Sequence, residues 1–136
     1  MAKNVFIDTS ALLAVLDADD ASHQAAKQVW ESIIAAGDTL VSHNYVLVET
    51  SALALRRLGL EALRVFESDI LPILRVVWVT RDIHAAAASA HLLGARRSLS
   101  LVDCASFEIM RRTGIRTAFA FDHHFQEYGF ALLASK

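Results

Sequence analysis

The sequence predicts an α/β fold, a three-layer α/β/α sandwich around a mostly parallel central sheet. Three observations lead to this fold class. Short apolar segments with strand character recur along the chain, helical patterns separate them, and the 136 residues contain no linker, repeat or low-complexity stretch. Strands joined by helical crossovers run parallel, and the length suits one ordinary domain. We therefore expect a single domain over residues 1–136.

The first half of the chain alternates strand and helix patterns. Val5, Phe6 and Ile7 are consecutive apolar residues, which is typical of a short buried strand. Gly37 is the expected end of the second helix. In order, this half is expected to form a strand at 4–8, a helix at 10–17, a helix at 21–36 and a strand at 39–42.

The second half continues the alternation with longer helical stretches. Asn44 is suited to cap the first of these helices and Gly59 to end it. Pro72, the only proline, closes the next helix, and Ser98 or Ser100 caps the last long one. In order, we expect helices at 45–58 and 60–71, a strand at 75–80, a helix at 82–93 ended by Gly94, a helix to Thr113, and strands at 116–122 and 130–134.

The composition excludes several classes of protein. The single cysteine, Cys104, rules out an internal disulfide framework and a cysteine-based zinc site. No uncharged apolar run reaches about 18 residues and no signal-peptide pattern begins the chain, so we expect no membrane span and a cytoplasmic protein. The net charge of −2 does not identify a partner, whereas the hydrophobic fraction of 54% hints at a partner surface as well as a core.

Four acidic side chains stand in apolar surroundings. Asp8 follows the strand pattern VFI and Asp122 follows FAF, so both lie at the carboxyl ends of expected strands, where parallel sheets bind ligands. Glu49 lies within YVLVETSALAL, and Asp103 lies early in a helix whose neighbours are mostly apolar. A carboxylate is rarely buried without a counter-charge or a metal ion.

Each acid also has a structural explanation. Asp8 is a suitable helix N-cap, and Asp122 could cap the turn that follows it. Ser100 and Asp103 resemble a capping box, with Asp where Glu or Gln is usual. Glu49 is the hardest of the four to explain in this way.

Taken together, the four acids point to a metal site. Carboxylates that converge within about 4–6 Å repel by about 4 kcal/mol per close pair unless a cation is bound. Mg²⁺ and Mn²⁺ prefer such oxygen ligands, whereas imidazole is a poor ligand for Mg²⁺, so we do not expect His123 or His124 to bind the ion. We interpret Thr9 and Ser10 as the helix cap, with hydroxyls that also hydrogen-bond the site, which frees Asp8 for the metal.

The motifs that carry these acids resemble those of the PIN-domain family, and most closely the VapC-type toxins of toxin–antitoxin pairs. They are VFIDTSAL with Asp8, NYVLVETSALALRRLG with Glu49, SLSLVDCASFEIMRRTGI with Asp103 and AFAFDHHF with Asp122. They occur in the family's order, and the match covers essentially the whole chain.

The resemblance implies an endoribonuclease dependent on Mg²⁺ or Mn²⁺, in which a metal-activated water hydrolyses RNA and leaves a 5′-phosphate and a 3′-hydroxyl. Asp8, Glu49 and Asp103 would be the main catalytic and metal-binding acids, and Asp122 would complete the cluster. The resemblance also implies a homodimer and a small VapB-like antitoxin that docks on the toxin and blocks its cleft.

Three Arg-Arg pairs interrupt the acidic average charge. Arg96 and Arg97 precede Asp103 by a few residues, so we expect them at the rim of the cleft, where they could neutralise RNA phosphates. The pairs at 56–57 and 111–112 are each followed by a glycine within two residues, and arginine near a helix C-terminus suits the helix dipole.

Two other enzymatic functions remain open. A PIN-domain nuclease can process RNA without an antitoxin, and a phosphatase could use Asp8 as a nucleophile on a similar sheet. The haloacid-dehalogenase-like pattern needs a second Asp at the position where Ser10 stands, which disfavours the phosphatase. A non-catalytic, RNA-binding PIN-like module would be expected to lack the acids that this chain retains.

Overall fold

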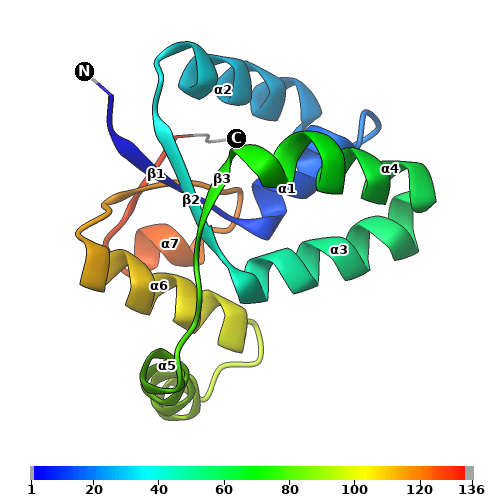
Figure 1. Ribbon diagram of the computed structural model, residues 1–136. Helices are drawn as coiled ribbons and strands as arrows, with labels where there is room; N and C mark the ends of the chain where they lie inside the picture. The colour runs from blue at the N-terminus through cyan, green and yellow to red at the C-terminus, as the bar shows by residue number, and fades with distance from the viewer. Residues whose placement is uncertain (1, 134–136) are drawn as a thin grey trace.

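The structure is a computed structural model that describes residues 2–133. Its centre is a five-stranded, wholly parallel sheet in the order β3-β2-β1-β4-β5 (Figure 1). The strands are β1 (Asn4–Ile7), β2 (Thr39–His43), β3 (Leu74–Val77), β4 (Thr117–Phe119) and β5 (Ala131–Leu132). The predicted α/β class with a parallel sheet is confirmed.

Strand β1 lies in the middle of the sheet, at the point where the strand order reverses. From β1 the chain adds β2 and β3 on one side, and it later returns to place β4 and β5 on the other. The backbone N–H of Asp8 donates to the carbonyl of Phe119 at 3.1 Å, so β1 and β4 stay together to their carboxyl ends. Ligand sites in parallel sheets lie at such a reversal, beyond the carboxyl ends of the strands.

Helices cover both faces of the sheet (Figure 1). Helices α1 to α4 lie on one side, where α1 packs against both α2 and α3, and helices α5 to α7 lie on the other, where α5 packs against α6. The bounds are α1 (Thr9–Leu16), α2 (His23–Ala35), α3 (Asn44–Leu58), α4 (Leu60–Val65), α5 (Arg81–Gly94), α6 (Leu101–Thr113) and α7 (His124–Glu127). None of the helices described is long and apolar enough to cross a membrane.

The hydrophobic core is centred on β1, and aromatic side chains pack within it. Val5, Phe6 and Ile7 have no exposed surface, as expected of the middle strand in a sheet covered on both faces. On the α6 side, the rings of Phe107 and Phe125 meet edge to face with centroids 5.0 Å apart. This contact anchors the short helix α7 against α6, and so positions the loop between β4 and α7.

The N-terminus of α3 corrects one prediction. His43, and not Asn44, is the N-cap, because its Nδ1 accepts the backbone N–H of Tyr45 at 3.2 Å and of Val46 at 3.4 Å. The side chain of Asn44 instead accepts the backbone N–H of Val79 at 2.6 Å. Asparagine is the better N-cap in isolation, but here a tertiary partner takes its side chain.

The predicted helix at 60–71 is also only partly correct. Regular helix ends at Val65, and a π-helical turn (Phe66–Ile70) and a 3-10 turn (Leu71–Ile73) follow before β3. Phe66 and Ile70 are buried, so the π-helical turn still places apolar side chains in the core. Pro72 therefore lies within the 3-10 turn and does not close a longer α-helix.

Helix α5 ends one residue later than predicted. Gly94 is its last helical residue, and Ala95 takes the left-handed conformation at the cap, with a φ of 49°. Glycine is favoured in this conformation because it has no Cβ, so the prediction placed the end at Gly94.

The strands are shorter than the sequence pattern suggests. Strand β3 ends at Val77 and β4 at Phe119, so Asp122 lies in the loop after the strand and is not its last residue. Of the last predicted strand, Ala131 and Leu132 form β5, and residue 134 lies outside the described residues.

Candidate functional site

Asp8 lies at the carboxyl end of β1 and is itself the N-cap of α1. Its Oδ2 accepts the backbone N–H of Ser10 at 3.1 Å and the hydroxyl of Ser10 at 2.6 Å. The prediction that Thr9 and Ser10 form the cap is therefore wrong: both lie inside the helix. Both hydrogen bonds go to Oδ2, so within residues 2–133 the other oxygen, Oδ1, remains available to a ligand.

Asp103 is held in the same way at the start of α6. The backbone N–H of Asp103 donates to the hydroxyl of Ser100 at 3.0 Å, and the backbone N–H of Ser100 donates to Oδ2 of Asp103 at 3.1 Å. This is a complete capping box with Asp in the third position. The structural explanation of Asp103 is thus correct, and it occupies only one of the two carboxylate oxygens.

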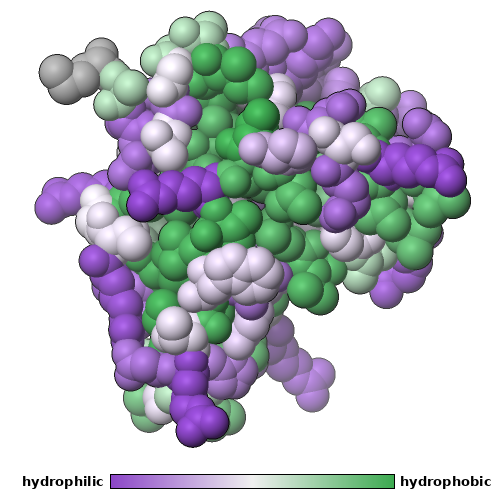
Figure 2. Space-filling view, in the orientation of Figure 1, coloured by the Kyte–Doolittle hydropathy of each residue, from purple (hydrophilic) through white to green (hydrophobic). Residues whose placement is uncertain are grey.

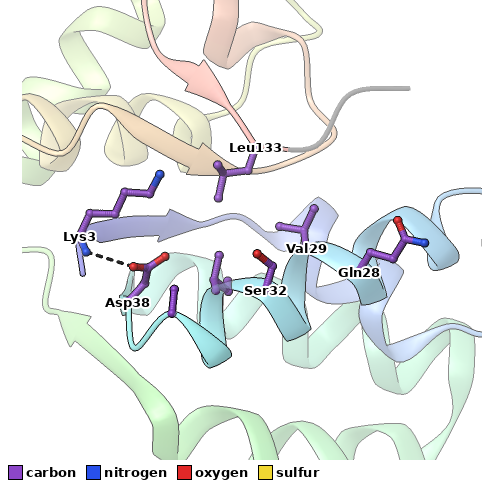
Figure 3. A pocket seen from close by; sticks show the side chains of 8 residues that line it. Lys3, Gln28, Val29, Ser32, Asp38 and Leu133 are labelled. Atoms are coloured by element: carbon purple, nitrogen blue, oxygen red, sulfur yellow. Dashed lines mark hydrogen bonds between the residues drawn. The ribbon is translucent and has the colours of Figure 1, made fainter. Parts of the chain in front are cut away.

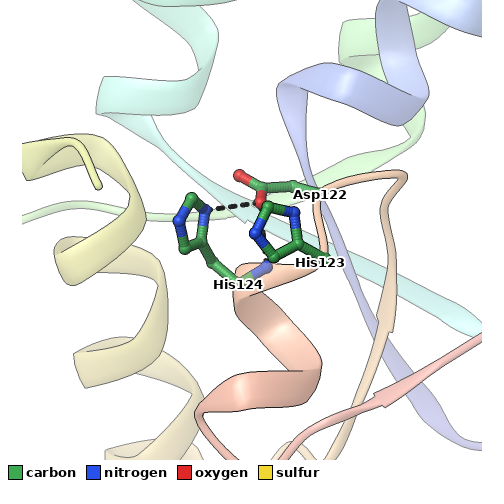
Figure 4. A group of neighbouring side chains, drawn as sticks. All are labelled: Asp122, His123 and His124. Atoms are coloured by element: carbon green, nitrogen blue, oxygen red, sulfur yellow. Dashed lines mark hydrogen bonds and ion pairs between the residues drawn. The ribbon is translucent and has the colours of Figure 1, made fainter. Parts of the chain in front are cut away.

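Asp122 receives two hydrogen bonds on one oxygen from His124 (Figure 4). The backbone N–H of His124 donates to Oδ1 at 2.9 Å, and Nδ1 of the same ring lies 2.6 Å from that oxygen. A carboxylate oxygen accepts, so Nδ1 carries the hydrogen. His124 is buried, and its other nitrogen, Nε2, lies 3.3 Å from the hydroxyl of Ser98.

The three aspartates lie close enough to affect one another's ionisation. Burial raises the pKa of Asp8 to about 7; the hydrogen bonds from Ser10 oppose the rise, and the charges of Asp103 and Asp122 add to it. Burial also raises the pKa of Asp103, and the charge of Asp122 contributes in the same direction. The carboxyl ends of β1 and β4 and the N-terminus of α6 thus bring three carboxylates together.

Glu49 lies on α3, half-buried, next to the point where α3 meets α1. The hydroxyl of Thr50 donates to the hydroxyl of Thr9 at 3.2 Å, which joins the two helices beside Asp8. Among the residues that the structure describes, no hydrogen bond or ion pair holds the Glu49 carboxylate. Thr9 thus contacts α3, while Ser10 contacts Asp8.

The donor set is the one that hard divalent cations prefer. Within residues 2–133, Asp8, Asp103 and Asp122 each use a single oxygen for local hydrogen bonds, which fixes the carboxylate and leaves its second oxygen for a ligand. Mutual repulsion raises the free energy of this arrangement in the absence of a cation, and Mg²⁺ or Mn²⁺ would relieve it. The residues present therefore fit a magnesium or manganese ion.

His123 and His124 both lie next to Asp122, but they differ in burial and in hydrogen bonding. One ligand atom each from Asp122, His123 and His124 lie within 4.8 Å of one another (Figure 4). Both ring nitrogens of His124 already have partners, and His123 is exposed. His124 is thus placed to orient Asp122, in the way that second-sphere groups orient metal ligands.

The arginines singled out in the sequence lie on two different parts of the fold. Arg96 and Arg97 are both exposed on the loop before α6, and Arg96 forms an ion pair with Glu127 of α7 at 3.2 Å. Arg57 lies in the last turn of α3, where its charge suits the helix dipole, and it lines a pocket together with Ser10. No local pattern could reveal this, because α1 and the end of α3 meet only in the folded chain.

A second pocket lies at the opposite edge of the sheet, away from the acids. It has a volume of about 400 Å³ and lies between α2 and the amino ends of β1 and β2 (Figure 3). The backbone N–H of Lys3 donates there to Asp38 at 3.1 Å. Its position at the amino ends of the strands separates it from the three aspartates.

The fold and the acids together define a class of protein. Residues 5–131 match the family model described as PIN domain, and the chain belongs to the PIN-domain family. The family predicted from the four motifs is confirmed, and with it the nuclease class.

One relative is similar over almost the whole chain. The 23S rRNA-specific endonuclease VapC20 of Mycobacterium tuberculosis is 36% identical over 127 residues, which are 93% of this chain and 95% of VapC20. The crystal structure of VapC20, described as a sarcin–ricin-loop-cleaving toxin, aligns with a TM-score of 0.83 and 35% identity over 93% of this chain and 96% of that one.

Two more distant structures share the fold alone. FitAcB from Neisseria gonorrhoeae aligns with a TM-score of 0.69 at 14% identity, over 94% of this chain and 95% of that one. A structure of FitAB bound to the IR36 DNA fragment aligns with a TM-score of 0.69 at 16% identity, over 95% of this chain and 93% of that one.

Proposed function

We propose that this protein is an endoribonuclease dependent on Mg²⁺ or Mn²⁺ and the toxin of a VapBC-type toxin–antitoxin pair. The observation that carries the proposal is the convergence of Asp8, Asp103 and Asp122, each with one oxygen fixed and one available. The similarity to VapC20 over 93% of the chain supports the same reaction class.

In this proposal the chain's own acidic residues hold the ion. Asp8, Asp103 and Asp122 bind the ion, and Glu49 completes the cluster from α3. A divalent ion at this position would lower the pKa of a bound water and neutralise charge on the phosphate. Ser10 keeps Asp8 oriented through its two hydrogen bonds.

The activity can be tested directly on RNA. We expect cleavage of 23S rRNA in purified ribosomes or of other RNA in the presence of Mn²⁺, abolished by EDTA and by Asp8→Asn. The matched control is Asp19→Asn, an exposed acid in the turn after α1 that should leave cleavage unchanged. Cleavage that persists in EDTA and in Asp8→Asn would exclude the proposed site.

The substrate is best sought first in ribosomal RNA. VapC20 is described as a sarcin–ricin-loop-cleaving toxin and is similar to this chain over 96% of its own length. We therefore propose the sarcin–ricin loop of 23S rRNA as the first candidate, to be tested by mapping cleavage ends on ribosomes. Cleavage at other sites would place the specificity elsewhere and leave the metal-dependent reaction intact.

The antitoxin distinguishes a toxin from an RNA-processing nuclease. We expect an adjacent reading frame for a small VapB-like protein whose co-expression relieves growth arrest and whose addition inhibits cleavage. A chain that cleaves RNA, arrests no growth and has no such neighbour would instead be a processing nuclease. In either case we propose that the protein acts in the cytoplasm, where its RNA substrate lies.

We also propose a homodimer formed through the apolar face of α3 and α4. Figure 2 shows hydrophobic residues gathered over this side of the molecule. Val48 is 68% exposed and Leu55 47% exposed, and both line a shallow groove together with Leu63 and Leu71. Monomers rarely expose a contiguous patch of this kind, so a second copy of the chain would cover it.

A further inference from the structure

A small polar pocket is lined by Ser10, which hydrogen-bonds Asp8, and by Phe121, which precedes Asp122. It has a volume of about 210 Å³ and is formed by α1, the turn before α2, the end of α3 and the loop after β4. Its polar lining comes from Ser10, Asp20, Ser22 and Arg57, and Phe121 contributes an aromatic ring. Leu13 and Ala14 of α1 complete an apolar wall.

This pocket shares a wall with the acid cluster. The hydroxyl of Ser10 donates to Asp8 at 2.6 Å and accepts the backbone N–H of Phe121 at 2.9 Å. Phe121 is in turn the residue before Asp122. A group seated in the pocket would therefore lie next to whatever the aspartates bind.

Arg57 brings a positive charge to an otherwise acidic region. The side chain is exposed at the end of α3, and within residues 2–133 no hydrogen bond or ion pair engages its guanidinium. Arg96 and Arg112, in contrast, are already paired with carboxylates. An unpaired guanidinium beside a metal-binding cluster can bind a phosphate with two parallel hydrogen bonds.

Asp20 supplies an acceptor on the pocket wall. Its Oδ1 accepts the backbone N–H of Ser22 at 2.7 Å, which fixes the carboxylate in the turn before α2. Carboxylates accept hydrogen bonds from the exocyclic amino groups of bases, and aromatic side chains stack on unpaired bases. The pocket thus combines a phosphate donor, a base acceptor and an aromatic ring.

We infer that this pocket is a subsite for the nucleotide adjacent to the scissile phosphate. Arg57 binds the backbone phosphate of that nucleotide, its base lies against Phe121, and Asp20 accepts a hydrogen bond from the base edge. The inference rests on the proposed ribonuclease function, and it names the residues that select the RNA at the same site.

The phosphate contact is tested with Arg57→Ala against the matched control Arg56→Ala, which removes the same charge from the neighbouring exposed residue. Binding of a fluorescent, mixed-sequence 12-nucleotide RNA is measured in EDTA at several salt concentrations. Arg57→Ala should lower the slope of log K against log salt by about 0.7, the contribution of one phosphate contact on a single strand. Equal slopes for the two variants would overturn the inference.

Cleavage kinetics separate this inference from the proposed function. On RNA that the wild type cleaves, Arg57→Ala should raise KM about tenfold with kcat less affected, and Arg57→Lys should recover part of the loss. If the wild type cleaves no RNA, the proposed function fails, and the binding measurement still decides whether Arg57 contacts phosphate.

The base contact is tested separately. Cleavage ends on a randomised RNA pool are sequenced for Asp20→Asn and for the neighbouring control Asp19→Asn. An amide donates where a carboxylate only accepts, so Asp20→Asn should change the base preferred at one position beside the cut, and Asp19→Asn should not. An unchanged preference in both variants would exclude base recognition by Asp20.

Discussion

At the scale of single residues, helix capping and ligand binding use different oxygens of the same carboxylates. Asp8 and Asp103 each cap a helix through Oδ2, and Asp122 is held through Oδ1 by His124. A local hydrogen bond removes rotational freedom from the carboxylate before any ion binds. The cap therefore preorganises the ligand rather than competing with it.

The pKa of Asp8 predicts a pH dependence of stability. The pKa of Asp8 is about 7 in the folded protein, against 3.8 in the unfolded chain. The folded protein therefore binds this proton more tightly than the unfolded chain does. The resulting stabilisation is complete below about pH 3.8 and is lost as the pH rises to 7. Relative to Asp8→Asn, metal-free wild type should lose up to about 4 kcal/mol of unfolding free energy between pH 4 and pH 8. Denaturant unfolding in EDTA measures the difference, and parallel curves for the two proteins would contradict it.

His124 is predicted to act by orienting Asp122. An asparagine amide can donate from nearly the position of Nδ1, so His124→Asn should retain much of the Mn²⁺ affinity, whereas His124→Ala should weaken it about 10- to 100-fold. Calorimetric Mn²⁺ titration measures both variants, and His123→Ala serves as the exposed control. Equal losses in His124→Asn and His124→Ala would argue for a direct metal ligand or a packing role.

At the scale of helices and strands, His43 ties the start of α3 to α6. Its Nδ1 accepts the backbone N–H groups of Tyr45 and Val46 in the first turn of α3. Its Nε2 lies 2.8 Å from the hydroxyl of Ser106, which donates to the carbonyl of Val102 at 2.9 Å. Ser106 is one turn after Asp103. This buried chain therefore fixes α3, which carries Glu49, relative to the turn that carries Asp103.

Burial of His43 predicts loss of stability in acid. Burial lowers its pKa to about 4, against 6.5 ordinarily, so the unfolded chain gains a proton that the folded chain does not as the pH falls from 6.5 to 4. The stability advantage of wild type over His43→Asn, which keeps an N-cap acceptor, should shrink by about 3 kcal/mol over this range. Denaturant unfolding at both pH values measures it; a constant advantage would show that His43 does not titrate this way.

At the scale of the whole molecule, the parallel sheet delivers residues from distant parts of the chain to one edge. Asp8, Asp103 and Asp122 come from three separate elements, and the reversal of strand order at β1 opens the site between β1 and β4. Exposed apolar side chains lie on several elements, and those of the proposed dimer face, Val48 and Leu55, lie on α3.

The proposed dimer predicts a change of mass with two surface substitutions. Val48→Glu with Leu55→Glu places two charges on the exposed apolar face of α3, and should convert the dimer to a monomer in sedimentation experiments. Leu92→Glu is the control, because Leu92 is 79% exposed on α5, away from that face. A wild-type protein that sediments as a monomer would refute the dimer.

The sequence by itself determined the fold class, the order of most elements and the family. Apolar runs such as Val5–Ile7 and the helix stops at Gly59 and Gly114 are local signals, and local physics suffices to interpret them. The four acids could be selected because a carboxylate in apolar surroundings is costly at any position in a fold.

Only the tertiary structure decided how those residues are used. It gave the cap of α3 to His43 because Val79 binds Asn44, and it brought Arg57 beside Ser10. These outcomes depend on tertiary contacts between segments that are far apart in the sequence. A hydrogen bond between residues 35 or 111 positions apart leaves no periodic or local signal in the sequence, because its two partners become neighbours only through the packing of the whole chain.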